Sequence, residues 1–342
     1  MRTKVCLTVD TEFSIGGAFT SDASRFPIAD PMVWCDVNGR SHGLGFLLDC
    51  LRRHQLQATF FVEALHRYYF QDDPMRPVVR AISAGGHEIQ LHEHPCWAVF
   101  QHPDWRERVR ANPNQDDFHG RCEEDMLALI NQGQEIFADW GLPPPKVFRS
   151  GGLQHDGTLY RALARAGIPY SSNIGLAIFD SGDPDYQLYS GCHERHGVKE
   201  FPVLTFNDWT LGKRRHLKSL TIAGTSFAEM CTLLERARQQ EVPMVVILTH
   251  PFEYVQSKDK RFTRKRPHSV NQSRLRRLCE YLDLHRDRYE TVGMASAIEG
   301  LALEDNRAQR NPLLRGVLWQ SVARLATQLT YDRFGRWALN RS

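Results

Sequence analysis

Four short groups of polar residues each follow an apolar run in this sequence. Residues 10–12 read Asp-Thr-Glu, 92–95 read His-Glu-His-Pro, 149–152 read Arg-Ser-Gly-Gly, and 250–251 read His-Pro. Polar side chains at the carboxyl ends of parallel strands meet at one edge of a sheet, where sites in α/β folds are built. We therefore expect the four groups to share one site.

The residue types in these groups suit metal-assisted acid–base chemistry. Residues two apart on an extended chain face the same way, so Asp10 pairs with Glu12 and His92 with His94. Two imidazoles and a carboxylate with an open position are the ligand set of a catalytic zinc ion or a similar divalent metal. The remaining acidic, guanidinium and imidazole groups are candidates for a base, an orienting group and an acid. Taken singly, each is ordinarily a hydrogen-bonded loop residue, but four on separate strands argue for a shared function.

The elements that must position these groups alternate between strand and helix. This alternation, about seven times over 300 residues, predicts an α/β fold, either a barrel or a doubly wound sheet. The purely apolar run 244–249 is typical of a buried parallel strand. The predicted strands are 5–9, 58–62, 88–91, 146–149, 169–172, 200–204, 244–249 and 290–292, and the predicted helices are 44–54, 75–84, 123–140, 158–166, 227–240 and 273–285.

Composition argues against a membrane-spanning protein, a secreted protein and a zinc site built from Cys-x-x-Cys pairs. The 342 residues carry 43 Lys and Arg against 40 Asp and Glu, and 42% of them are hydrophobic, as in an ordinary globular protein. The N-terminal residues lack the apolar stretch of a signal peptide and no apolar run is long enough to cross a membrane, so we predict a cytoplasmic protein. Eight cysteines without a Cys-x-x-Cys pair predict free, buried thiols; only Cys96 stands out, because it lies in a histidine-rich segment.

Two segments are strongly basic. Six of the nine residues in 258–266 are Lys or Arg, on the loop expected beside His250, and such a loop is either simply solvated or attracts an acidic substrate. After residue 306, seven arginines face the single acid Asp332, and apolar residues recur at helical spacing. This tail, 303–342, is predicted to be a basic amphipathic helix. It would pack on the main domain 1–302, lie at the inner face of a membrane, or contact a partner.

The ordered motifs resemble those of the polysaccharide deacetylase superfamily, the NodB-homology domain of carbohydrate esterases. The resemblance rests on five segments in the family's order, between about residues 3 and 300, and excludes the basic tail. They are 8–12 (Thr-Val-Asp-Thr-Glu), 58–62 (Ala-Thr-Phe-Phe-Val), 86–95 (Gly-His-Glu-Ile-Gln-Leu-His-Glu-His-Pro), 148–151 (Phe-Arg-Ser-Gly) and 248–251 (Leu-Thr-His-Pro).

The resemblance implies a distorted, incomplete (β/α)7 barrel and a role for each residue. A divalent metal, with zinc as first candidate and cobalt, nickel or manganese as alternatives, would be held by Glu12, His92 and His94. Asp10 would be the general base, oriented by Arg149. His250 would be the general acid, and Trp209 lies in the region where the family lines its cleft.

The chain departs from the family pattern at three points. Thr11 separates two acids that are usually adjacent, and the histidines are two residues apart instead of four. The proline that usually lies two residues beyond the motif arginine is replaced, so that Arg149-Ser150 is followed by Gly151-Gly152. His94, on the shortened loop, is therefore the ligand that most needs a structural test.

The implied activity is metal-dependent hydrolysis of an N-acyl, chiefly N-acetyl, group from an amino sugar. The substrate would be a polysaccharide or its nucleotide- or lipid-linked precursor in surface polysaccharide biosynthesis. The alternative is a degenerate relative that binds glycan without hydrolysis. Nucleic-acid binding is not expected, because the isoelectric point is only about 8.4 and the basic segments lack interleaved aromatic residues.

Overall fold

The computed structural model describes residues 2–22, 24–212, 214–259, 261–301 and 309–341, with side chains up to Tyr331. The strands of the main sheet are β1 (Thr3–Thr11), β4 (Thr59–Glu63), β5 (Glu88–Glu93), β6 (Val147–Ser150), β7 (Tyr170–Ser171), β8 (His193–Arg195), β9 (Val198–Glu200), β12 (Met244–Thr249) and β15 (Tyr289–Thr291). The helices are α1 (Asp30–Val33), α2 (Leu44–Arg53), α3 (Met75–Ala84), α4 (Trp105–Ala111), α5 (Glu123–Asp139), α6 (Gly157–Arg165), α7 (Phe227–Gln239), α8 (Ser269–Leu284), α9 (Met294–Glu299) and α10 (Leu318–Arg341).

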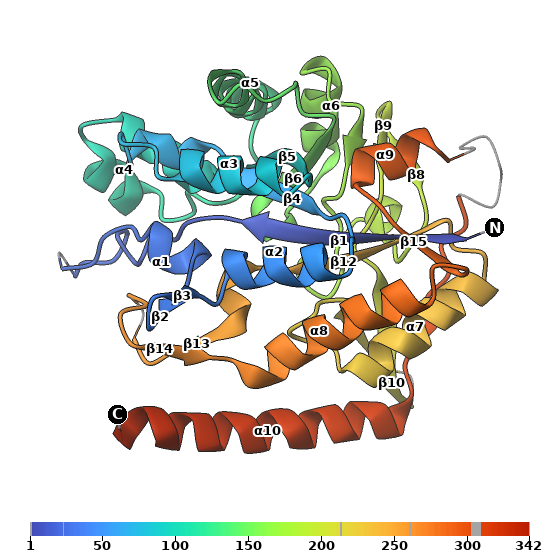
Figure 1. Cartoon of the computed structure of the whole chain (residues 1–342). Coiled ribbons are helices and arrows are strands. Elements are labelled where there is room, and N and C mark those ends of the chain that lie inside the picture. Colours follow the sequence, from blue (N-terminus) through green and yellow to red (C-terminus); the bar gives the residue numbers. More distant parts are fainter. Residues whose placement is uncertain (1, 23, 213, 260, 302–308, 342) are drawn as a thin grey trace.

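The main sheet is a curled half-barrel with the strand order β12-β1-β4-β5-β6-β7-β9-β8. The pairings from β12 to β9 are parallel, β8 is antiparallel at the end, and β15 adds to β1. In Figure 1, α5 and α6 lie above β1 and β4, whereas α7, α8 and α10 lie below β1. The predicted incomplete (β/α)7 barrel is thus confirmed.

The core explains why these strands are so apolar. Every residue of β4 and β12 is buried, as expected where helices cover both faces of a parallel sheet. The amphipathic helices contribute a complementary apolar face, as in α3, where Met75, Val78, Val79 and Ile82 are buried.

The far end of the half-barrel approaches β12 through isolated bridges. Val203 pairs with Val246 and Thr221 with Leu248, both in parallel, which joins the segments after β9 to β12. The predicted strand 200–204 is wrong in its bounds, because β9 ends at Glu200. Pro202 has no backbone N–H to give to a ladder, so regular pairing stops there.

Strand register brings the four polar groups to one edge. Val9 pairs with Thr249, so Asp10 and His250 follow at the same level. His92 pairs directly with Arg149 on the next strand. Parallel pairing therefore places side chains that are up to 240 residues apart in sequence around one mouth.

Smaller sheets, which the sequence did not predict, decorate this scaffold. They are β10 (Thr205–Leu211) with β11 (Arg214–Ser219) and β16 (Leu314–Arg315), β13 (Val255–Ser257) with β14 (Lys265–Pro267), and β2 (Asp36–Val37) with β3 (Arg40–Ser41). The β13–β14 hairpin carries the basic segment 258–266, of which Lys260 lies outside the described residues.

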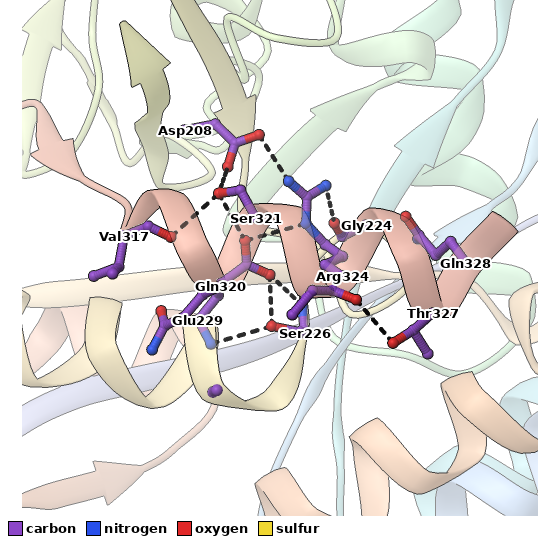
Figure 2. A network of polar contacts seen from close by, with 12 residues as sticks. Asp208, Gly224, Ser226, Glu229, Val317, Gln320, Ser321, Arg324, Thr327 and Gln328 are labelled. Atoms are coloured by element: carbon purple, nitrogen blue, oxygen red, sulfur yellow. Dashed lines mark hydrogen bonds and ion pairs between the residues drawn. The ribbon is translucent and has the colours of Figure 1, made fainter. Parts of the chain in front are cut away.

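The predicted C-terminal helix is present as α10, and its charged groups dock it on the main domain. Arg324 Nη2 lies 2.7 Å from Asp208 Oδ2, and its Nε lies 3.1 Å from Glu229 Oε1; all three side chains are buried (Figure 2). The predicted domain boundary at 302/303, Arg307, and the side chains of the acidic and basic residues beyond Tyr331 lie outside the described residues. None of the described helices is long and apolar enough to cross a membrane.

Candidate metal centre and catalytic groups

The three predicted metal ligands converge. Glu12 Oε2 lies 3.1 Å from Nε2 of His92 and 2.7 Å from Nε2 of His94. The three potential ligand atoms, one from each residue, all lie within 4.8 Å of one another. Glu12 follows β1 and the two histidines lie at the end of β5, as their sequence spacing predicted.

The hydrogen bonds of the two rings leave the correct nitrogens for a metal. His92 Nδ1 lies 2.9 Å from the carbonyl oxygen of Arg149, which can only accept, so this nitrogen carries the proton. His94 Nδ1 likewise donates to the carboxylate of Asp116, at 2.8 and 3.0 Å from its two oxygens. Both Nε2 atoms then face Glu12 and are the nitrogens that would bind a metal once unprotonated, the arrangement in which second-shell groups orient metal-binding imidazoles. The donor set therefore fits a divalent metal.

The charges of this cluster are strongly coupled. Burial would raise the pKa of Glu12, but the neighbouring His94 charge and the hydrogen bonds from both histidines hold it well below its ordinary value. Burial would lower the pKa of His94, but Asp116 and Glu12 raise it well above its usual range. The negative charges of Asp116 and Glu12 on either side of the His94 ring favour a positive charge at this position, which a metal cation would supply.

Asp116 contacts the predicted ligand His94 and was not predicted from the sequence. It lies in the loop after α4, 22 residues from His94, with no apolar run or motif beside it to mark it. Its Oδ1 also accepts a 3.4 Å hydrogen bond from the backbone N–H of Cys96. Cys96, His94 and Asp116 form a second group of potential ligand atoms, but burial raises the pKa of the Cys96 thiol well above its usual range and disfavours the thiolate.

Gly151 makes room for the His94 ring. A Cβ atom at this position would lie 2.4 Å from His94 Nδ1 and 2.6 Å from Cε1 and Cγ, far inside van der Waals contact. Two of the departures from the family pattern are thus structurally linked, because the short His-x-His spacing brings the second ring against residue 151, which must be glycine.

The backbone of His94 is fixed by another buried acid. Glu63, at the end of β4, accepts hydrogen bonds from the backbone N–H groups of Leu65 and His94. Burial raises the pKa of Glu63 to about 8, against the lowering effect of His94 and of these hydrogen bonds.

Asp10 and Arg149 form a buried ion pair next to the metal ligands. Arg149 Nη1 lies 2.7 Å from Asp10 Oδ1 and also donates to Thr8 Oγ1 at 2.9 Å. Its other nitrogens donate to the carbonyl oxygen and hydroxyl of Ser172, and the guanidinium lies over the Phe61 ring. Because four of its five N–H groups are engaged, the guanidinium holds the Asp10 carboxylate in one orientation.

His250 faces the same carboxylate from β12. Its Nε2 lies 3.9 Å from Asp10 Oδ2, and its Nδ1 lies 3.2 Å from Glu253 Oε1. Burial would lower the pKa of His250, but Glu253, followed by Glu12 and Asp10, raises it to about 9. Glu253 was also missed by the sequence analysis, although its spacing of three residues from His250 was a usable signal.

Trp209 lies on a separate hairpin. It is in β10, with its ring stacked on His216 at a centroid distance of 5.0 Å, next to the Asp208 that binds α10. Its contact with substrate stays a prediction. The basic loop, in contrast, touches the segment that follows Glu12: Arg261 lies 3.6 Å over the Phe26 ring and donates to the carbonyl of Ser24.

One family of known proteins matches part of this chain. The family model for polysaccharide deacetylase matches residues 39–171, the part of the chain that contains His92, His94 and Arg149. No curated protein matches the chain.

Solved structures are similar at low identity. A polysaccharide deacetylase described as putative from Mycobacterium smegmatis is 15% identical over 92% of this chain and 95% of its own, with a TM-score of 0.48. A family 4 carbohydrate esterase from Streptomyces lividans is 16% identical over 87% and 95%, with a TM-score of 0.40. A 4-alpha-glucanotransferase from Thermococcus litoralis is 11% identical over 88% of this chain and 41% of its own, with a TM-score of 0.50, a likeness of fold alone. Residues 39–171 of this chain are thus similar to polysaccharide deacetylases, and the ordered motifs of the sequence resemble the same family.

Proposed function

We propose that this protein hydrolyses the N-acyl group, an acetyl group in the first instance, from an amino sugar in a metal-dependent reaction. The observation that carries the proposal is the convergence of Glu12, His92 and His94 beside the Asp10–Arg149 pair and His250. In the reaction, water adds to the acyl carbon, the C–N bond breaks, and a carboxylate and a free amine leave.

Glu12, His92 and His94 would hold the metal, with zinc as our first candidate. A divalent cation at this position supplies Lewis-acid activation of water and of the acyl carbonyl. Asp116 and the Arg149 carbonyl would act through the ligands, since they fix which nitrogen of each ring faces the cation.

Asp10 is the proposed general base. Its Oδ1 is occupied by Arg149, which leaves Oδ2 on the side of His250 to receive the proton of the attacking water. The rigid setting of Arg149 between Asp10, Thr8 and Ser172 keeps this oxygen aimed at the mouth of the barrel.

His250 is the proposed general acid. With a pKa near 9, its imidazole is mostly protonated at neutral pH and can deliver a proton to the departing amine. Glu253 fixes the ring through Nδ1, so that the donating nitrogen is Nε2, on the side of Asp10.

The basic loop favours an acidic substrate. Asp259 orders the loop by accepting hydrogen bonds from the backbones of Arg261, Thr263 and Arg264, so the loop presents its positive charge in a fixed shape. We propose that the sugar is carried on a phosphate-containing group, as in a nucleotide- or lipid-linked polysaccharide precursor.

Acetate release tests the proposal. The zinc-loaded protein is assayed against N-acetylglucosamine oligomers and against nucleotide- and diphospholipid-linked N-acetyl amino sugars. We expect acetate from at least one phosphate-linked substrate, and none from the Asp10→Asn variant. Binding of these substrates without acetate release would support the glycan-binding alternative, and full turnover by Asp10→Asn would refute the assignment of the base.

A further inference from the structure

Helix α10 is docked with its polar side inward. Its buried or half-buried side chains are Gln320, Ser321, Arg324, Gln328 and Tyr331, which recur along one face. A helix that packs on a globular domain ordinarily buries its apolar side and turns its polar side to water. The reversal in α10 requires an explanation.

The inward face is fully engaged in polar contacts. Arg324 spans Asp208 and Glu229, and Ser321 donates to Asp208, as Figure 2 shows. Further along the helix, Gln328 donates to the carbonyl of Ala223. These bonds fix the rotation of the helix, so the opposite face cannot turn toward the domain.

The outward face carries an apolar stripe of five side chains, each 48 to 71% exposed. They are Leu318, Trp319, Val322, Leu325 and Leu329. Between residues 318 and 331 the only charged side chain is the buried Arg324, so the exposed surface of this part of the helix is uncharged. At 1.5 Å per residue the stripe is about 16 Å long, and α10 lies along the outer edge of the molecule (Figure 1).

Positive charge borders the stripe. A groove of about 570 Å³ between α10, α7 and α8 is lined by three arginines and three serines, with no acidic side chain. Arg324 is paired with two carboxylates and Arg274 is buried, so Arg277 supplies the exposed positive charge. Trp319 lines the same groove, and exposed Arg315 lies three residues before the first residue of the helix. Arg277 is exposed, lies over the Phe227 ring, and has no carboxylate partner among the residues that the structure describes.

We propose that this face, the α10 stripe together with its arginine-lined groove, docks on an anionic lipid bilayer. The leucines and Trp319 would enter the boundary between headgroups and acyl chains, and Arg277 and Arg315 would meet lipid phosphates. This combination of an apolar face, an interfacial tryptophan and flanking arginines is the chemistry of helices that lie in the plane of a membrane.

A second copy of the chain suits the stripe less well. Residues 318, 322, 325 and 329 follow the 4-3-4 spacing of a coiled-coil seam, but the next positions in the sequence, 332 and 336, are Asp and Arg. A coiled coil needs the pattern over three or four heptads, and a stable dimer buries about 20 to 30 residues on each side. Five side chains fall well short of that.

Vesicle sedimentation of the full chain tests this docking, independently of catalysis. Vesicles of phosphatidylcholine with phosphatidylglycerol are compared with phosphatidylcholine alone, at low and high salt. We expect binding to the anionic vesicles that weakens with salt. The double variant Leu325→Gln/Leu329→Gln should bind them at least about tenfold less well, and Arg277→Gln should lose binding to anionic vesicles only. The control is Leu284→Gln, at the end of α8, where the leucine is 72% exposed but off the stripe.

The outcomes separate the alternatives. Failure of the intact protein to sediment with anionic vesicles, or equal binding by the double variant, would overturn the proposal. Light scattering measures the mass of each protein in solution, and the double variant should match the intact chain. A dimer that the double variant converts to a monomer would assign the stripe to a second copy instead. Circular dichroism confirms that each variant keeps its helices.

Discussion

Replacing Gly151 by alanine should weaken metal binding although residue 151 is not a ligand. The added Cβ would lie 2.4 Å from His94 Nδ1, and ordinary contact begins near 3.4 Å, so the imidazole must move by about 1 Å. Ligand distances in metal sites are held to about 0.2 Å. A shift of this size takes Nε2 out of bonding range or breaks the hydrogen bond to Asp116.

The expected loss of zinc affinity can be worked out from the hydrogen bond to Asp116 that the His94 ring would lose. Loss of a second-shell partner typically costs about 10- to 100-fold in metal affinity, which is about 1.4 to 2.7 kcal/mol. We expect a loss of at least this size for Gly151→Ala, measured by calorimetric titration of the metal-free protein with zinc. The backbone at residue 151 is outside the left-handed region, so alanine adds no backbone strain there.

The neighbouring glycine provides the matched control. Gly152 has a φ of +60° and meets only Gln154 Cγ, at 3.9 Å, so Gly152→Ala should lower stability by about 1 to 2 kcal/mol through backbone strain. It should leave zinc affinity unchanged. Wild-type zinc affinity in Gly151→Ala would refute the link between the short His-x-His spacing and glycine at 151.

Four further changes test the remaining groups. Asp10→Asn should lower kcat by about 10²- to 10⁴-fold while zinc titration is unchanged; parallel loss of zinc would make Asp10 a ligand instead. Asp116→Asn should lower zinc affinity about 10- to 100-fold, and an unchanged titration would show that it does not orient its imidazole. His250 is protonated below its pKa of about 9, so activity should fall as the pH rises through 9. Because Glu253 raises this pKa, Glu253→Gln should move the alkaline fall in activity to lower pH. An alkaline fall that stays in place would exclude His250 as the acid. Arg324→Met should cost about 3 to 5 kcal/mol in urea unfolding, because it leaves two buried carboxylates without their arginine partner. A near-neutral change would show that these ion pairs do not hold α10.

The parts of the site that lie at strand ends could be predicted from the sequence. An apolar run followed by Asp10, His92 or His250 marks both a strand and its carboxyl end. The parallel register of the strands then brings these ends together. Asp116 could not be predicted, because it reaches His94 from a loop that belongs to no strand.

The orientation of the C-terminal helix could not be predicted from the sequence either. Apolar spacing predicted a helix over the tail, and α10 is present, but the pattern alone did not predict which face turns inward. That choice depends on Asp208 and Glu229, more than 90 residues away, whose buried carboxylates require Arg324. Long-range charge pairing thus overrides the usual rule that the apolar face is buried.

The central claim is that Glu12, His92 and His94 form a single divalent metal site, and zinc titration of the metal-free full-length protein tests it most directly. We expect one zinc ion per chain, and no measurable binding at this site in the double variant Glu12→Gln/His92→Gln, with the fold retained by circular dichroism. Absence of zinc binding by the intact chain, or unchanged binding by the double variant, would contradict it.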